Sequence, residues 1–240
     1  MSNYLRNFNV RIDKKEAIVT PEYFLTGFPP QITYTKEDIV RVVKESEIPI
    51  FLGFAESVKG HKYSSYTGKI DGKMIHARKM QAYQKTERRY ISGGIKRPNV
   101  WKTSLGKLTV LLCYDAYRVS KESSKYFDNS IDVILVPSFW KLCHAALLEK
   151  CCILSKRCKC NVINSDYYHG IHTFMNGDLA YNRLPKRPVF FKCVYCENEA
   201  VDYCWNCCQE LCLSHISYMN VEERIGFCPL CQKIKQGIRK

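Results

Sequence analysis

Residues 106–115, G-K-L-T-V-L-L-C-Y-D, decide the fold class of this chain. The apolar run at 108–112 predicts a buried β-strand, and the pattern after Cys113 predicts a helix. Cys113 is therefore expected at a strand-to-helix turn. There a side chain projects from the sheet edge, and the helix N-terminus lowers the pKa of a thiol. This position suits a catalytic cysteine, and a plain core cysteine at a strand end is the alternative.

Short apolar runs and helical patterns alternate through the first 184 residues. Asp71-Gly72 predicts a tight hairpin turn, and Thr35 predicts a helix N-cap. Together the patterns predict a mixed α/β body. Strands are expected at 16–19, 48–54, 63–70, 73–79, 107–113, 131–136 and 161–164, and helices at 36–46, 120–127 and 142–156.

The composition limits the possible classes of protein. Of 240 residues, 46% are hydrophobic, enough to bury a core, which argues against global disorder. No apolar stretch predicts a signal peptide or a membrane span, so we expect an intracellular, cytoplasmic protein. The formal charge is +14, from 37 Lys+Arg and 23 Asp+Glu. The basic residues are scattered, so only nonspecific, salt-sensitive binding to nucleic acid is expected.

The fourteen cysteines fall into three groups. Cys113 stands alone. The second group lies mostly in a predicted helix and is interpreted as packing residues. Its members are Cys143, Cys151, Cys152, Cys158 and Cys160. The third group is dense and lies between Cys193 and Cys231. In a reducing compartment such a cluster favours metal ligands over disulfides.

The dense cluster has the spacing C-x2-C-x7-C-x2-C-x4-C-x2-H-x12-C-x2-C. Four pairs of soft ligands predict two structural Zn²⁺ ions in tetrahedral sites. In interleaved order one ion is held by Cys193, Cys196, Cys212 and His215, and the other by Cys204, Cys207, Cys228 and Cys231. Sequential pairing stays open. Cys208 is expected to be the spare thiol, and an exchange of roles between Cys207 and Cys208 also stays open.

Residues 203–215, Y-C-W-N-C-C-Q-E-L-C-L-S-H, resemble a B-box type of cross-braced zinc finger. Cys228 and Cys231 stand where histidines are usual, so RING-like and other treble-clef modules also remain open. The resemblance implies a protein partner, in some relatives within ubiquitin-linked pathways. A domain of this size is expected to need metal because it cannot bury enough core.

Three motifs, in this order along the chain, resemble the nitrilase superfamily of carbon–nitrogen hydrolases over about residues 8–182. They are P-E-Y-F-L-T-G-F at 21–28, A-R-K-M-Q-A-Y-Q-K-T-E-R-R-Y-I-S-G-G at 77–94, and the stretch 106–115. Segments 132–140 and 161–170 also resemble that family. The resemblance implies an α-β-β-α sandwich, here expected to be truncated at both ends. Exposed sheet edges would then need a cover, and we expect a homodimer or the zinc module to provide it.

The resemblance also implies the catalytic residues. Cys113 would be the nucleophile, Glu22 the general base, and Lys79 the cation that offsets developing charge. Glu87 corresponds to a second glutamate close to the lysine, and the backbone N–H of Tyr114 would line the oxyanion site. This chemistry proceeds through an acyl-thioester and needs no cofactor.

A basic, proline-flanked segment separates the two parts. We predict a nitrilase-like domain at 1–184, a linker at 185–191, a two-zinc domain at 192–233 and a basic tail at 234–240. The expected function is a hydrolase for a small amide or nitrile-type substrate. Met80-Gln81-Ala82 and the residues after Asp115 depart from the family pattern at substrate-pocket positions, so the substrate is not implied. The alternative is an inactive nitrilase-like scaffold that recruits protein partners through the zinc module.

Overall fold

The computed structural model describes residues 8–12, 15–83, 87–127, 130–139 and 144–183, and beyond these 195–196, 198, 202–203, 210–211, 213–220, 225–229 and 232. The chain divides into two compact units, which are described separately. The first comprises Met1–Ala82 and Tyr90–Arg187, and the second comprises Tyr83–Arg89 and Pro188–Lys240. None of the helices in the described part combines the length and apolar character needed to cross a bilayer. The predicted linker lies outside the described residues.

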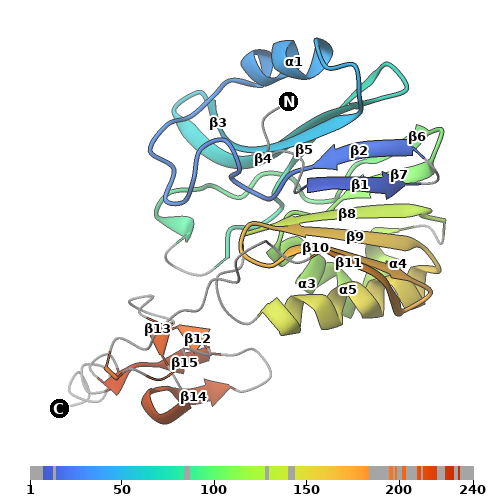
Figure 1. Cartoon of the computed structure of the whole chain (residues 1–240). Helices are drawn as coiled ribbons and strands as arrows, with labels where there is room; N and C mark the ends of the chain where they lie inside the picture. The colour runs from blue at the N-terminus through green and yellow to red at the C-terminus, as the bar shows by residue number, and fades with distance from the viewer. Residues whose placement is uncertain are drawn as a thin grey trace. The chain divides into compact units, whose positions relative to one another are not determined.

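The first unit contains two sheets (Figure 1). The first sheet has the strand order β1-β2-β3-β4-β5, and only the β2–β3 pair in this sheet is parallel. Its strands are β1 (Asn9–Ile12), β2 (Lys15–Val19), β3 (Ile50–Val58), β4 (His61–Ile70) and β5 (Lys73–Arg78).

Helix α1 (Lys36–Lys44) connects β2 to β3. Its N-cap is Thr35, as predicted. The Thr35 hydroxyl accepts a hydrogen bond from the N–H of Asp38, whose carboxylate accepts one from the N–H of Thr35. This reciprocal capping box fixes the start of the helix.

The second sheet has the order β11-β10-β9-β8-β7-β6. Its strands are β6 (Val100–Thr103), β7 (Gly106–Val110), β8 (Val133–Ser138), β9 (Asn161–Asp166), β10 (Gly170–Met175) and β11 (Asp178–Arg183). The central strands β7, β8 and β9 are parallel. Helices α3 (Tyr114–Lys121) and α4 (Ser123–Tyr126) connect β7 to β8, and α5 (His144–Cys158) connects β8 to β9. Every residue of β8 is buried, as expected for a parallel strand covered on both faces.

The two sheets enclose one apolar core, so the unit is an α-β-β-α sandwich. Val19 and Phe51 enter this core from the first sheet, and Leu108 and Leu135 enter it from the second. Helix α1 covers the outer side of the first sheet, and α3 and α5 lie on the outer side of the second (Figure 1). The hydroxyl of Ser165 in β9 donates to the carbonyl of Val19 in β2 at 2.6 Å. The predicted mixed α/β sandwich is confirmed.

Some predicted boundaries were wrong. The helix after Cys113 begins at Tyr114 and not at residue 120, and β7 ends at Val110 and not at residue 113. The strands β1, β6, β10 and β11 were not predicted. They are short, polar or bounded by glycine, and therefore have weak periodicity. β1 is the first strand of the unit, and β10 and β11 are its last two strands. The sheets therefore extend further toward both ends of this unit's sequence than the patterns predicted.

In the described part of the second unit, the strands are short. Strand β12 (Asp202–Tyr203) pairs with β13 (Glu210–Leu211), and β14 (Ser217–Asn220) pairs with β15 (Ile225–Phe227). A single 3₁₀ turn, Leu213–His215, lies between the two pairs. Of the residues described after 195, Ile216 and Cys228 are buried.

Candidate active site

Glu22 and Lys79 form a buried ion pair in the first unit. Glu22 lies in the turn that follows β2, and Lys79 directly follows β5. Lys79 Nζ is 2.9 Å from Glu22 Oε1, and each side chain is 1% exposed. The hydroxyl of Ser64 in β4 donates to the same oxygen at 2.5 Å. Burying a charge is costly unless it is paired and hydrogen-bonded, and here both conditions are met.

Two glycines let the backbone pack closely around this pair. A Cβ on Gly53 would lie 2.1 Å from the carbonyl oxygen of Pro21, next to Glu22. A Cβ on Gly94 would lie 2.7 Å from the carbonyl oxygen of Lys79, to which the N–H of Gly94 donates at 2.9 Å. Any side chain at these positions would displace the segments that carry the pair. Gly53 lies in none of the sequence motifs, and no role was predicted for Gly94, the last residue of the motif at 77–94.

Cys113 lies at the predicted strand-to-helix turn, where it precedes α3. Its backbone has φ 50° and ψ −103°, a conformation rare for residues other than glycine. The turn is held by its neighbours, because the N–H of Cys113 donates to the Pro137 carbonyl at 2.9 Å and its carbonyl accepts from the N–H of Ala116 at 3.1 Å. Tyr23, next to Glu22, also has a positive φ of 56°. Backbone strain of this kind concentrates at functional sites.

Asp115 ties the turn of Cys113 to the segment of Lys79. Its carboxylate accepts hydrogen bonds from the N–H groups of Met80 at 2.8 Å and Gln81 at 3.2 Å. Burial raises the pKa of Asp115 to about 7, and the charge of Lys79 and the two backbone hydrogen bonds limit the rise. Asp115 lies within the motif at 106–115, but no role was predicted for it. An acidic residue two positions after a candidate nucleophile was the available signal.

A second buried carboxylate, Glu56 of β3, fixes the end of β5 beside Lys79. It accepts two hydrogen bonds from Arg78, at 2.7 and 2.8 Å, and one from Ser65 at 2.6 Å. Burial raises the pKa of Glu56, but the hydrogen bonds from Arg78, His76 and Ser65 outweigh it and hold the pKa well below its usual value. We assign this cluster a structural role, because its hydrogen bonds hold neighbouring strands of one sheet together.

The other two residues implied by the family resemblance are placed as follows. Tyr114 is the first residue of α3, directly after Cys113. Its role at the oxyanion site stays a prediction. Glu87 belongs to the second unit, where it is buried and its carboxylate accepts a hydrogen bond from the N–H of Tyr83. Its implied place close to the lysine also stays a prediction.

Comparison with known proteins supports the fold. No family model matches the sequence, and no curated protein matches it. One similar solved structure is a cysteine-to-alanine mutant of the Nesterenkonia sp. AN1 amidase, a protein of the nitrilase superfamily. The TM-score is 0.59 at 15% identity, and the match covers 72% of this chain and 74% of that one. The chain has the nitrilase fold.

Two further structures show the same fold. In one, the Nesterenkonia amidase carries acrylamide added to its active-site cysteine, with a TM-score of 0.59 and 15% identity over 70% of this chain and 76% of that one. The other is a glutamine-dependent NAD⁺ synthetase from Acinetobacter baumannii, with a TM-score of 0.54 and 16% identity over 72% of this chain. This chain spans only 38% of the synthetase. At these identities the similarity concerns the nitrilase fold.

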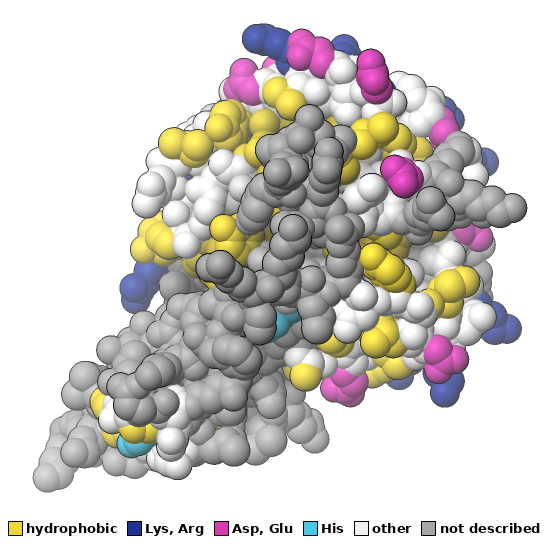
Figure 2. Space-filling view, in the orientation of Figure 1, with side chains coloured by type: hydrophobic (Ala, Val, Ile, Leu, Met, Phe, Trp, Pro, Cys, Tyr) yellow, Lys and Arg dark blue, Asp and Glu magenta, His cyan; other side chains and the backbone are white. Residues whose placement is uncertain are grey.

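The charged side chains show no strong concentration on the face in Figure 2. The described Lys and Arg side chains there lie apart from one another, and Asp and Glu lie among them. On this face of the protein, the described side chains give no sign of a dense basic patch for nucleic acid.

Three of the eight predicted zinc ligands lie within the described residues: Cys196, His215 and Cys228. Cys196 Sγ lies 3.6 Å from His215 Nδ1, and Cys228 is fully buried. The described residues contain no group of three or more potential metal ligands. The remaining predicted ligands fall outside the described residues; they are Cys193, Cys204, Cys207, Cys212 and Cys231.

Proposed function

We propose that the first unit is a thiol hydrolase that cleaves a non-peptide carbon–nitrogen bond of an amide. The buried Glu22–Lys79 pair carries the proposal, because Asp115 ties the segment of Lys79 to the turn of Cys113. Buried ion pairs are weak contributors to stability, since the cost of desolvation offsets much of the attraction. A pair with 1% exposure on each side is therefore better explained by chemistry than by folding.

The proposed reaction has two halves. Glu22 takes the proton of the Cys113 thiol, and the thiolate attacks the carbonyl carbon of the amide. The Lys79 ammonium and the N–H of Tyr114 stabilise the negative oxygen that forms. Glu22 returns the proton to the nitrogen, which leaves as an amine or ammonia. Water, deprotonated by Glu22, then attacks the acyl-thioester, and the acid leaves as the thiol is restored.

Two of the departures from the family pattern, Met80 and Gln81, are compatible with this arrangement. Asp115 binds the main-chain N–H groups of Met80 and Gln81, so its contact does not depend on which side chains stand there. The inactive scaffold is the alternative function, with the altered pocket motifs in its favour.

Turnover on a panel of amides, carbamoyl compounds and nitriles tests the proposal. We expect the full-length protein to release ammonia or amine and to show an acyl adduct at Cys113 by mass spectrometry. Cys113→Ala should abolish both, and Glu22→Gln should slow turnover by about 10²- to 10⁴-fold. Cys152→Ala, a cysteine of α5, is the matched control. Equal inertness of wild type and Cys113→Ala across the panel would favour the scaffold.

We also propose that the second unit binds two structural Zn²⁺ ions in the interleaved order. Two ligands of one tetrahedral zinc, with Zn–S about 2.3 Å and Zn–N about 2.0–2.1 Å, lie about 3.6 Å apart. The separation of Cys196 Sγ and His215 Nδ1 is 3.6 Å and so fits one shared ion. Interleaved pairing gives Cys196 and His215 the same ion, whereas sequential pairing gives them different ones. Zinc would supply stability here and no catalytic step.

Two double variants distinguish the pairings by zinc content. In the interleaved order, Cys196→Ser with Cys212→Ser removes two ligands of one ion and leaves one zinc per chain. Cys196→Ser with Cys204→Ser removes a ligand from each ion and leaves none. Sequential pairing predicts the reverse. Clearly fewer than two zinc ions per wild-type chain, prepared without chelator, would contradict both.

The protein partner of the zinc module remains a prediction, and so does the homodimer. Sedimentation velocity on the full chain measures the oligomeric state directly.

A further inference from the structure

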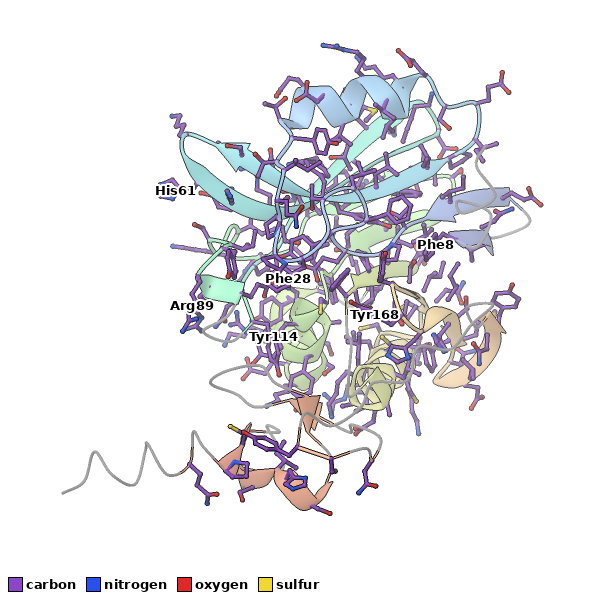
Figure 3. All side chains as sticks on the ribbon, turned by 60° about the vertical axis from the view of Figure 1, so that its left-hand side comes forward. Phe8, Phe28, His61, Arg89, Tyr114 and Tyr168 are labelled. Carbon is purple, nitrogen blue, oxygen red and sulfur yellow. The ribbon has the colours of Figure 1, made fainter. Side chains whose placement is uncertain are left out.

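Six aromatic side chains form a contiguous group in the first unit, in which the sixth, Tyr90, lies 5.9 Å from Phe28. We call the other five the aromatic wall: Tyr23, Phe28, Phe139, Tyr167 and Tyr168. Phe139 is at the centre, with its ring centroid 5.0 Å from that of Tyr167 and 5.2 Å from that of Tyr168. It lies 6.2 Å from Tyr23 and 6.3 Å from Phe28. Figure 3 labels Phe28 and Tyr168 of this group, together with Tyr114.

The topology places this wall beside the candidate catalytic residues. Strands β7, β8 and β9 are parallel, so their carboxyl ends meet at one sheet edge. Cys113 follows β7, Phe139 follows β8, and Tyr167 follows β9. The N–H of Cys113 donates to the carbonyl of Pro137, two residues before Phe139. From the first sheet, Tyr23 directly follows Glu22.

Hydrogen bonds hold the ends of β8 and β9, which Phe139 and Tyr167 follow. The hydroxyl of Ser138, at the end of β8, donates to Asp166, at the end of β9, at 2.6 Å. The other carboxylate oxygen of Asp166 accepts the N–H groups of Tyr168 at 2.9 Å and His169 at 3.1 Å. Ser138 and Asp166 are themselves fully buried. The part of the wall that follows β9 is therefore held in place by these hydrogen bonds.

The wall is also partly open to solvent. Tyr23 is buried, but Phe28, Phe139 and Tyr168 are half-buried, and Tyr167 is 38% exposed. Contiguous rings that stay partly exposed mark a binding surface more often than a core, because folding would otherwise bury them. Rings of this kind bind a planar apolar group by offset or edge-to-face contacts.

We infer that the aromatic wall binds a planar, apolar acyl group, so that arylalkanoic amides are hydrolysed in preference to short aliphatic amides. This inference rests on the proposed function. The acyl group stays attached to Cys113 as the thioester, so the surface next to Cys113 must accommodate it. One or two added ring contacts correspond to a preference of about 10- to 100-fold over an aliphatic chain.

The kcat/KM ratio of 3-phenylpropanamide to butyramide measures the preference. We expect a ratio of about 10 to 100 for the full-length protein and a fall of about tenfold in Phe139→Ala. Tyr181→Ala, at a 46% exposed tyrosine of β11 outside the wall, is the matched control and should keep the wild-type ratio. Phe139→Leu keeps most of the volume but loses the ring, and it replaces Phe139→Ala if that variant does not fold. A ratio near one in wild type would overturn the inference while leaving the hydrolase intact.

Binding without chemistry separates the inference from the proposed function. In Cys113→Ala, calorimetry or NMR titration should show 3-phenylpropanamide binding at least tenfold more tightly than butyramide, and the added Phe139→Leu should reduce this difference. Such binding by a protein that hydrolyses no amide would support the wall and contradict the hydrolase. Equal affinity for the two amides, or binding of neither, would overturn the inference.

Discussion

Asp115 is a buried carboxylate whose charge changes near neutral pH. Its pKa is about 7 in the folded chain against an ordinary value of 3.8. The folded state therefore holds this proton more tightly than the unfolded state does. Stability from this group is fully present below pH 3.8 and is lost as the pH rises through 7.

Asp115→Asn should remove this pH dependence. Between pH 5 and pH 8, we expect the unfolding free energy of wild type to fall by roughly 3 kcal/mol relative to the variant. Urea denaturation of both proteins at pH 5 and pH 8 measures this difference in unfolding free energy. The titration of other groups is common to both proteins and cancels in the comparison. Parallel pH profiles would show that Asp115 titrates normally.

Gly53 should tolerate no side chain. In Gly53→Ala the new methyl would lie 2.1 Å from the Pro21 carbonyl oxygen, so the turn that carries Glu22 must move. We expect a loss of about 1–3 kcal/mol of stability and at least a tenfold loss of kcat/KM. Gly60→Ala, with no atom within 4 Å of its Cβ, is the control and should affect stability only, through its φ of +80°. Unchanged turnover in Gly53→Ala would contradict the proposed constraint on Glu22.

The candidate reactive residues could be predicted from the sequence. The residues that hold them in position could not. Glu22, Lys79 and Cys113 were predicted as site residues because each lies in a motif with its own residue pattern. Gly53 and Asp115 act on segments more than 30 residues away in the chain. Such contacts depend on strand pairing, which a single sequence does not reveal.

The strand-to-helix turn at Cys113 is strained as an element. Its φ of 50° and ψ of −103° resemble the first central position of a type II′ turn, where glycine is usual. In an ordinary position glycine is less stable than alanine by about 0.5–1 kcal/mol. At this turn the order should be reversed, because alanine bears the strain.

We therefore expect Cys113→Gly to be more stable than Cys113→Ala by about 1 kcal/mol. Thermal or chemical denaturation of the two variants measures this difference in stability. The same exchange at Cys152, within α5, is the control, and there glycine should be the less stable by about 1 kcal/mol. Cys113→Ala proving the more stable would show that the turn relaxes without strain.

Elements with strong patterns were predicted well, and edge elements were not. The Asp71-Gly72 turn has φ of 50° and 73°, as the hairpin signal predicts. Helix α3 was placed too late because Tyr114, Asp115 and Ala116 give no strong apolar period. Its start is set instead by the turn at Cys113, a tertiary feature.

At the scale of the whole molecule, the two units differ in what holds them. The first has an extensive apolar core shared by two sheets, whereas the second is the unit for which we propose two structural zinc ions. The two units are therefore expected to respond differently to the loss of metal.

Chelation should unfold only the second unit. In hydrogen exchange of the full chain, a strong zinc chelator should abolish protection in β14 and β15 while β8 and β9 keep theirs. Adding back excess zinc should restore protection, which controls for nonspecific effects of the chelator. Full protection of β14 and β15 in protein shown to be metal-free would contradict a structural role for zinc.

The candidate site lies at the seam between two sheets, since Glu22 and Lys79 come from the first sheet and Cys113 from the second. The bond from Ser165 to the Val19 carbonyl joins β9 to the strand that leads to Glu22. A small slip of one sheet against the other would leave both sheets intact and yet separate Glu22 from Cys113. The temperature at which a protein built this way stops working would then be set by alignment between its layers, and it would lie below the temperature at which the chain unfolds.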